Sequence, residues 1–167
     1  MTYKRILVPV DGSPTSAAGL KEALKLAKDQ RAKLRLLHVI DELIVFNTPE
    51  TAVNIEPIIE ELKRGGERVL QAAGRLALAK GIRPESDLRE SAGVRVSEVI
   101  GAQARRWRAD LIVMGTHGRR GVNRMLMGSD AELVVRNAST PVLLVPAGAG
   151  APNAARRSKR AGKSKRK

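Results

Sequence analysis

The amino-acid sequence predicts an α/β fold, a doubly wound five-stranded parallel sheet with helices on both faces. Short apolar runs rich in Val, Ile and Leu alternate with longer segments whose apolar residues recur at helical spacing. The length of 167 residues suits one such domain with an extension, because a chain of ~150 residues can bury about 68–70% of its unfolded surface around one core.

The composition excludes several functional classes. The chain has no cysteine, which removes disulfides, thiolate catalysis and cysteine-ligated metal. Its two histidines, His38 and His117, are not part of an HExxH pattern. Aromatic residues make up only 2% of the chain, which disfavours stacking on bases. No apolar run resembles a signal peptide or a membrane span, so we expect a soluble, cytoplasmic protein.

The first strand is expected at residues 4–10, where the residues are apolar and partly β-branched. A turn follows, with Ser13 as N-cap and Pro14 at the first position of a helix over residues 14–29. Asp11 lies just beyond the carboxyl end of the strand, where open parallel sheets bind ligands. It either contacts a ligand or only caps the turn.

Residues 34–40 form the second expected strand, which contains His38 as a structural histidine. A connection of about 14 residues, Asp41 to Asn54, is of a length that often carries function. A long helix then runs to a C-cap near Gly81, and the pair Gly65-Gly66 is expected to weaken or bend it.

Residues 82–90 contain a proline and several charges, which predicts a short edge strand. A third helix is marked by apolar positions from Val96 to Trp107, and the fourth strand covers residues 111–114. The last helix and strand are expected at residues 130–138 and 141–145.

A glycine-rich connection joins the fourth strand to the last helix. Gly115, Gly118 and Gly121 allow close approach of the backbone to a ligand, and Arg119, Arg120 and Arg124 add positive charge. The helix start at Gly128-Ser129 exposes unpaired amides, which favours phosphate. Ser129 also forms the Ser-x-x-Glu pattern of a capping box with Glu132, whereas Asp130 would repel phosphate if it turned inward.

The spacing Gly115-x2-Gly118-x9-Gly128-Ser129 resembles the signature of the ATP-binding branch of the universal stress protein family. The segments Ile6–Ser13 and Ala138–Val145 extend the resemblance, which covers roughly residues 3–146. It implies the strand order 3-2-1-4-5, which brings Asp11 and Gly115 to one crevice. It also implies ATP binding in stress response or signalling and a homodimer paired through the last strand.

Carried onto this sequence, the resemblance implies a set of nucleotide-binding residues, with Asp11 also holding Mg²⁺. The set is Pro9, Val10, Asp11, Val39, Met114, Gly115, His117, Gly118, Arg119, Gly128, Ser129 and Asp130. No residue that would position a hydrolytic water is recognisable, so we expect a binding protein and not an enzyme, with at most slow ATP hydrolysis. A slow ATPase switch remains an alternative.

The chain changes character after the domain expected at residues 1–147. Residues 151–167 contain eight Lys or Arg and no acid, so removing them lowers the net charge from +14 to +6. We expect the tail, residues 148–167, to be disordered and to bind nucleic acid or another polyanion weakly. The alternatives are a nucleic-acid-associated stress protein that uses this tail, and a tail that only aids solubility.

Overall fold

Strands and helices alternate along the chain in the computed structural model, which describes residues 2–42, 56–116 and 128–146. The elements are β1 (Arg5–Pro9), α1 (Pro14–Gln30), β2 (Lys33–Ile40), α3 (Glu56–Leu78), β3 (Glu85–Glu90), α4 (Val96–Trp107), β4 (Leu111–Gly115), α5 (Ser129–Asn137) and β5 (Val142–Val145). Each of the expected strands and helices is present, with ends shifted by a few residues. The expected tail and most of the connection after β2 lie outside the described residues.

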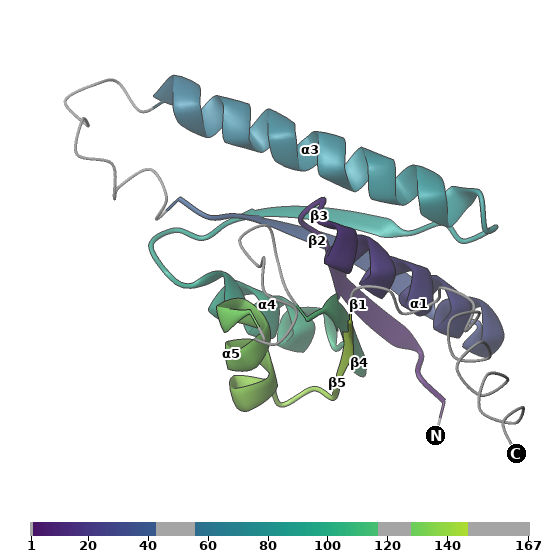
Figure 1. Cartoon of the computed structure of the whole chain (residues 1–167). Coiled ribbons are helices and arrows are strands. Elements are labelled where there is room, and N and C mark those ends of the chain that lie inside the picture. Colours follow the sequence, from purple (N-terminus) through teal and green to yellow (C-terminus); the bar gives the residue numbers. More distant parts are fainter. Residues whose placement is uncertain (1, 43–55, 117–127, 147–167) are drawn as a thin grey trace, which may run out of the picture.

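All five strands pair in parallel in the order β3-β2-β1-β4-β5, which confirms the doubly wound sheet (Figure 1). The central strand β1 pairs with β2 on one side and β4 on the other, with Leu7 opposite both Arg35 and Ile112. All strands point the same way, but β2 and β3 are added on one side of β1 whereas β4 and β5 are added on the other. This arrangement leaves the ends of β1 and β4 side by side, with Asp11 and Gly115 at the same edge.

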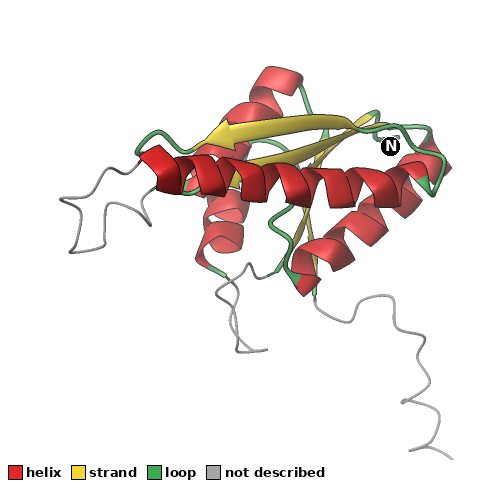
Figure 2. Ribbon diagram, turned by 90° about the horizontal axis from the view of Figure 1, so that it is seen from above, coloured by secondary structure: helices red, strands yellow, loops and turns green. Residues whose placement is uncertain are grey.

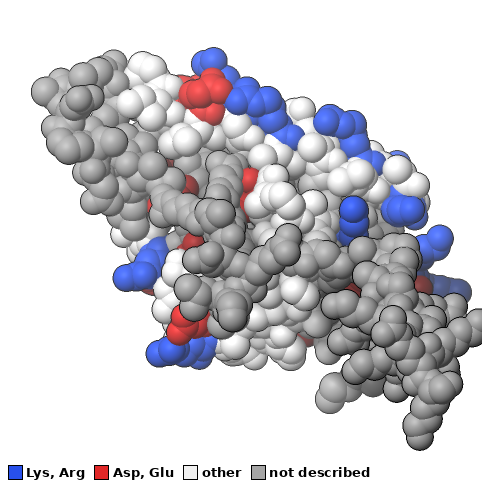
Figure 3. Space-filling model, in the orientation of Figure 1, with Lys and Arg blue, Asp and Glu red and all other residues white. Residues whose placement is uncertain are grey.

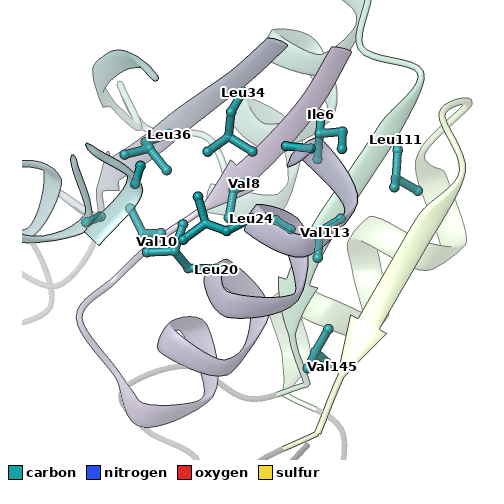
Figure 4. Close-up of a cluster of buried hydrophobic side chains, with 14 of the residues drawn as sticks. Ile6, Val8, Val10, Leu20, Leu24, Leu34, Leu36, Leu111, Val113 and Val145 are labelled. Carbon is teal, nitrogen blue, oxygen red and sulfur yellow. The ribbon is translucent and has the colours of Figure 1, made fainter. Parts of the chain in front are cut away.

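Helices cover both faces of the sheet (Figure 2). On one face α1 and α3 pack against the sheet, where Leu20 and Leu24 of α1 meet the strand residues Ile6, Val8 and Val113 (Figure 4). On the other face α4 and α5 bury a second cluster, which comprises Leu7, Leu37, Ile100, Ala104, Trp107, Ile112, Met114, Ala131 and Val134. Within the described ranges, no helix combines the length and the apolar character that crossing a membrane requires.

The expected bend at Gly65-Gly66 is wrong. Helix α3 runs through both residues as one element, and Figure 1 shows no sharp change of direction. Gly66 is buried, and a Cβ there would lie 2.6 Å from Cδ2 of His38 and 2.7 Å from Cδ1 of Leu88. The glycine therefore lets α3 approach β2 and β3 closely, and this packing offsets its low helix propensity.

Candidate functional site

A cavity of about 430 Å³ opens at the carboxyl ends of the strands, where β1 and β4 diverge. Its volume lies within the range of small-molecule sites. Nine of the twelve residues predicted from the sequence line it, namely Pro9, Val10, Asp11, Val39, Met114, Gly115, Gly128, Ser129 and Asp130. The other three, His117, Gly118 and Arg119, lie outside the described residues.

Asp11 both shapes a turn and faces the cavity. Its Oδ1 accepts the backbone N–H of Ser13 at 2.9 Å. The Ser13 hydroxyl in turn accepts the N–H of Ser16 at 3.1 Å, so Ser13 is the predicted N-cap of α1. Asp11 therefore caps the turn and also lines the cavity, so the capping role does not exclude contact with a ligand.

His38 is held from two sides at the floor of the site. It is 5% exposed, and its Nδ1 lies 2.7 Å from the carbonyl oxygen of Val10, to which it donates. Gly66 of α3 packs against the opposite part of the ring. These contacts confirm the expected structural histidine. They also fix the end of β1 against β2, next to Val39.

The N-terminus of α5 meets the cavity, but its cap differs from the prediction. Gly128 is the N-cap and Ser129 is the first helical residue, so the capping box centred on Ser129 is wrong. The Gly128 N–H donates to the carbonyl oxygen of Thr116 at 2.9 Å, which joins the two described ends of the glycine-rich connection. The Gly128 carbonyl accepts the N–H of Glu132 and begins the helical bonding.

Several lining residues were not predicted from the sequence. They are Ser16, Leu37, His38, Ile40, Asp41, Glu61, Leu62, Gly65, Val96, Ile100 and Ala131. Leu62 and Gly65 come from α3, whereas Val96 and Ile100 come from α4. The sequence pattern identifies Leu62, Val96 and Ile100 only as part of the apolar face of a helix, and Gly65 only as a residue that weakens a helix. Their place in the cavity depends on how the helices cross the sheet.

The described part of the lining is acidic. Asp11, Asp41, Glu61 and Asp130 contribute carboxylates, and no Lys or Arg is among the described lining residues. Arg68 donates to Glu61 at 2.7 Å and lowers the pKa of that carboxyl. A cation bound together with an anionic ligand would reduce repulsion between that ligand and these carboxylates.

A second group of charges links α3 to the ends of β2 and β3. Lys63 forms an ion pair with Glu90 at 2.9 Å, and Glu42 Oε2 accepts the N–H of Ala92 at 3.1 Å. Burial raises the pKa of Glu42, and the neighbouring Glu90 carboxylate adds to this shift. The hydrogen bond from Lys63 lowers the pKa of Glu90.

Replacing Glu42 with glutamine should change how stability depends on pH. The folded-state pKa of Glu42 lies above the ordinary value of 4.5. The folded protein therefore binds this proton more tightly, and its stability falls as pH rises from about 4.5 through the folded-state pKa. Glutamine keeps an acceptor for Ala92 and removes this loss. The melting temperature of Glu42→Gln relative to the parent should therefore increase with pH across that window.

The control for this titration is Glu67→Gln, which removes an exposed carboxylate on the same helix as Lys63. A difference between Glu42→Gln and parent that stays constant with pH would contradict the burial of the Glu42 carboxyl.

The strand order and the position of the cavity define a doubly wound α/β protein with a cavity at the switch point of its sheet, the place where such sheets bind ligands. Within this class, the model of the universal stress protein family matches residues 2–146, and the chain belongs to that family.

Individual relatives agree with the match. A universal stress protein of Methanocaldococcus jannaschii is 37% identical over 143 residues, which cover 86% of this chain and 82% of the relative. The crystal structure of a family protein from Burkholderia pseudomallei is 35% identical, with a TM-score of 0.71 over 87% of this chain and 97% of that one.

Two structures of nucleotide complexes share the fold. A universal stress protein in complex with cAMP has a TM-score of 0.62 and 24% identity, with 88% of this chain and 99% of that chain covered. One from Archaeoglobus fulgidus in complex with dAMP has a TM-score of 0.60 and 24% identity, with 87% and 99% covered.

Proposed function

We propose that this universal stress protein binds ATP in the cavity between the ends of β1 and β4, and that it acts in stress response or signalling in the cytoplasm. The observation that carries the proposal is the cavity itself. Its lining combines a helix N-terminus with apolar side chains, so the phosphates and the adenosine of a nucleotide each have a suitable surface to bind.

The phosphates are assigned to the start of α5. The first amides of a helix have no partner within the helix, and the helix dipole is positive at this end. Gly128 carries no side chain that would obstruct these amides, and the exposed Ser129 can add a hydroxyl donor. In the sequence, Arg119, Arg120 and Arg124 of the same connection supply positive charge.

The adenosine is assigned to the apolar side of the cavity. Val39, Val96, Ile100 and Met114 line this side, and Asp11 is the polar group nearest to the end of β1. An apolar slot with few polar groups is typical of sites for planar ligands. The relatives solved with cAMP and dAMP carry adenine nucleotides on the same fold, which supports an adenine nucleotide here.

Mg²⁺ fits the acidic lining as part of the nucleotide complex. The described residues contain no group of three or more His, Asp or Glu that could cage a metal alone. Mg²⁺ commonly binds through one or two carboxylates together with substrate phosphates and water. Asp11 is the proposed carboxylate, and the ion would offset the repulsion between the phosphates and the carboxylates of the cavity.

The proposed role is binding and not turnover. The described lining includes His38, but its Nδ1 is engaged with Val10 and it serves the fold. Rapid hydrolysis would need a residue that orients water against the terminal phosphate. We assign no such residue, and a slow ATPase switch is the second candidate function.

The test is calorimetric titration of ATP into the parent and into Gly128→Val. Gly128 has extended backbone angles, φ −64° and ψ 145°, which valine adopts without strain. Its added methyl groups should block phosphate at the helix start. Affinity should fall about 10- to 100-fold, which corresponds to losing a hydrogen bond to a charged group worth ~1.5–3 kcal/mol. The melting temperature without ligand should fall modestly, because valine is a poorer N-cap than glycine.

The control variant is Gly74→Ala on α3, where an added Cβ meets nothing within 4 Å. It should bind ATP as the parent does. Titrations of Asp11→Asn with and without Mg²⁺ test the metal, because this variant should lose the Mg²⁺-dependent part of the affinity. A Gly128→Val protein that binds ATP as tightly as the parent would refute the phosphate position.

We also propose that two copies pair through β5. This strand lies at an edge of the sheet, it carries no charge, and Leu143 is 36% exposed. An uncharged apolar edge is a template for strand pairing. Weak polyanion binding by the tail, residues 148–167, stays a prediction from its charge, because the tail lies outside the described residues.

A further inference from the structure

Exposed cations gather at the amino ends of the strands, the edge of the sheet opposite to the cavity. In a parallel sheet every loop that precedes a strand reaches this edge. Six exposed Lys and Arg side chains lie in or next to the loops before β1, β2, β3 and β4, and we call them the basic edge: Lys4, Arg31, Lys33, Lys80, Arg83 and Arg108. In Figure 3, blue side chains lie along α3 and at the end of the molecule where α3 ends.

Hydrogen bonds fasten three of these loops together. The Lys33 N–H donates to the carbonyl oxygen of Lys4 at 2.8 Å. Asp110, just before β4, accepts the N–H groups of Lys4 at 2.7 Å and Arg5 at 3.1 Å. Because neighbouring strands are about 4.8 Å apart, the loops that carry these cations lie side by side at this end of the sheet.

The basic edge keeps its charge. Among the described residues none of its six members forms an ion pair. The Asp110 carboxylate accepts backbone N–H groups, and Glu85 at the start of β3 pairs with Arg35. Asp110 keeps its charge, and together with the exposed neighbouring Asp29 it offsets only part of the positive charge of the six cations.

Two of the arginines occupy positions that favour glycine. Arg31 ends α1 with φ 54°, and Arg108 ends α4 with φ 55°. At both ends the next residue, Ala32 or Ala109, donates its N–H back into the helix, so each forms a Schellman motif, whose left-handed residue is usually glycine.

At the same edge the left-handed residue after α3 is a glycine, Gly81, with φ 77°. The backbone does the capping at Arg31 and Arg108, so their side chains are not needed for it. The chain therefore has arginine where glycine would be less strained. This is expected if the guanidinium groups serve contacts outside the fold.

We infer that the basic edge binds the phosphate backbone of duplex nucleic acid without reading its sequence. Interfaces with nucleic acid are more polar and much more positive than those with proteins, and this edge carries exposed cations around the hydrogen bonds that join its loops. Stacking on single strands needs exposed aromatic rings, whereas Trp107 at this edge is buried. The edge lies at the opposite ends of the strands from the cavity, so this inference is independent of the proposed ATP site.

Two other partners fit the edge less well. A protein interface has an apolar core, which a row of cations does not supply. Stable binding to a membrane surface needs apolar insertion besides basic charge. The exposed Leu76 and Leu78 would supply it at the end of α3 alone, not along the row.

The test uses the full chain and a fluorescent DNA duplex of about 20 bp, with anisotropy measured between about 50 and 200 mM salt. The variant is Arg31→Gly with Arg108→Gly. Each lost phosphate contact removes about 0.9 from the slope of log affinity against log salt, so the slope should become shallower by about 2. The melting temperature should equal or exceed that of the parent, because glycine relieves the left-handed strain.

The matched control is Lys21→Gln with Arg64→Gln, which removes the same charge from α1 and α3 away from the edge. It should leave the slope unchanged, whereas Lys4→Gln with Lys33→Gln, which alters no left-handed residue, should shift it as the glycine variant does.

Three outcomes would overturn the inference. The first is a slope of log affinity against log salt that stays unchanged in both edge variants. The second is a shift of this slope in the control variant equal to that in the edge variants. The third is that the edge variants bind the duplex normally but lose binding to phosphatidylserine vesicles. The last outcome would assign the edge to a membrane surface.

Discussion

Replacing Gly115 with alanine should destabilise the ligand-free protein by about 3 kcal/mol or more, at the upper end of overpacking effects. A Cβ at residue 115 would lie 2.6 Å from the carbonyl carbon and oxygen of Thr15 and 2.9 Å from the nitrogen of Ser16. These are backbone atoms of the first turn of α1, and they cannot rotate away as a side chain would. Denaturant titration without nucleotide measures the effect.

The contact between α1 and β4 is reciprocal, since a Cβ at Gly19 would lie 3.0 Å from the nitrogen of Gly115. Gly101→Ala in α4 is the control, because its Cβ would meet only a flexible arginine group, Nη1 of Arg105, at 3.6 Å. It should stabilise the protein by up to about 1 kcal/mol through helix propensity. If Gly115→Ala were as stable as the parent, Gly115 would not be required for packing, and ligand approach would remain its role.

Replacing Trp107 with alanine should cost about 3–5 kcal/mol. The ring is 8% exposed and belongs to the apolar cluster under α4 and α5. The guanidinium carbon of Arg35 lies 4.7 Å from the ring centroid, and that of Arg5 lies 5.9 Å from it. Alanine would leave a cavity and remove the aromatic face on which these cations lie. Urea denaturation followed by circular dichroism measures the loss without needing tryptophan fluorescence.

Trp107→Phe separates volume from the interaction with the cations. Phenylalanine keeps an aromatic face and most of the apolar volume, so its cost should be clearly smaller than that of alanine. The Arg5 bond to the Trp107 carbonyl oxygen, 2.9 Å long, involves the backbone and is present in both variants. If both variants lost the same free energy of unfolding, the aromatic face and apolar volume that phenylalanine keeps would contribute nothing, and the shape of the indole ring would account for the whole effect.

The fold and one side of the candidate site could be predicted because they depend on local patterns. Apolar runs and helical spacing placed every strand and helix to within a few residues. The strand order that brings the ends of β1 and β4 together came from the resemblance, and Asp11, Met114 and Gly115 line the cavity at that place. ATP itself remains a proposal, because the resemblance and the cavity chemistry support it without testing it.

The errors concern contacts between elements. In the sequence, Gly66 is a weak helix position. Its role in packing depends on its contacts with His38 of β2 and Leu88 of β3. The Gly115 contact with Thr15 likewise joins residues far apart in sequence. At α5 the capping box predicted Ser129 as the N-cap, but the N-cap is Gly128 and the helix begins one residue earlier than the capping box implied. Spacing along one segment carries no information on these contacts.

The two edges of the sheet differ in whether they can accept another strand, and this difference limits how far the protein can assemble. The outer strand β3 carries Glu85, Asp87, Arg89 and Glu90, whereas β5 is uncharged. Charged side chains on an edge oppose strand addition. If two copies join through β5, the combined sheet ends in β3 on both sides. Growth would therefore stop at two copies, and a fibre built by continued strand addition would be disfavoured even at high protein concentration.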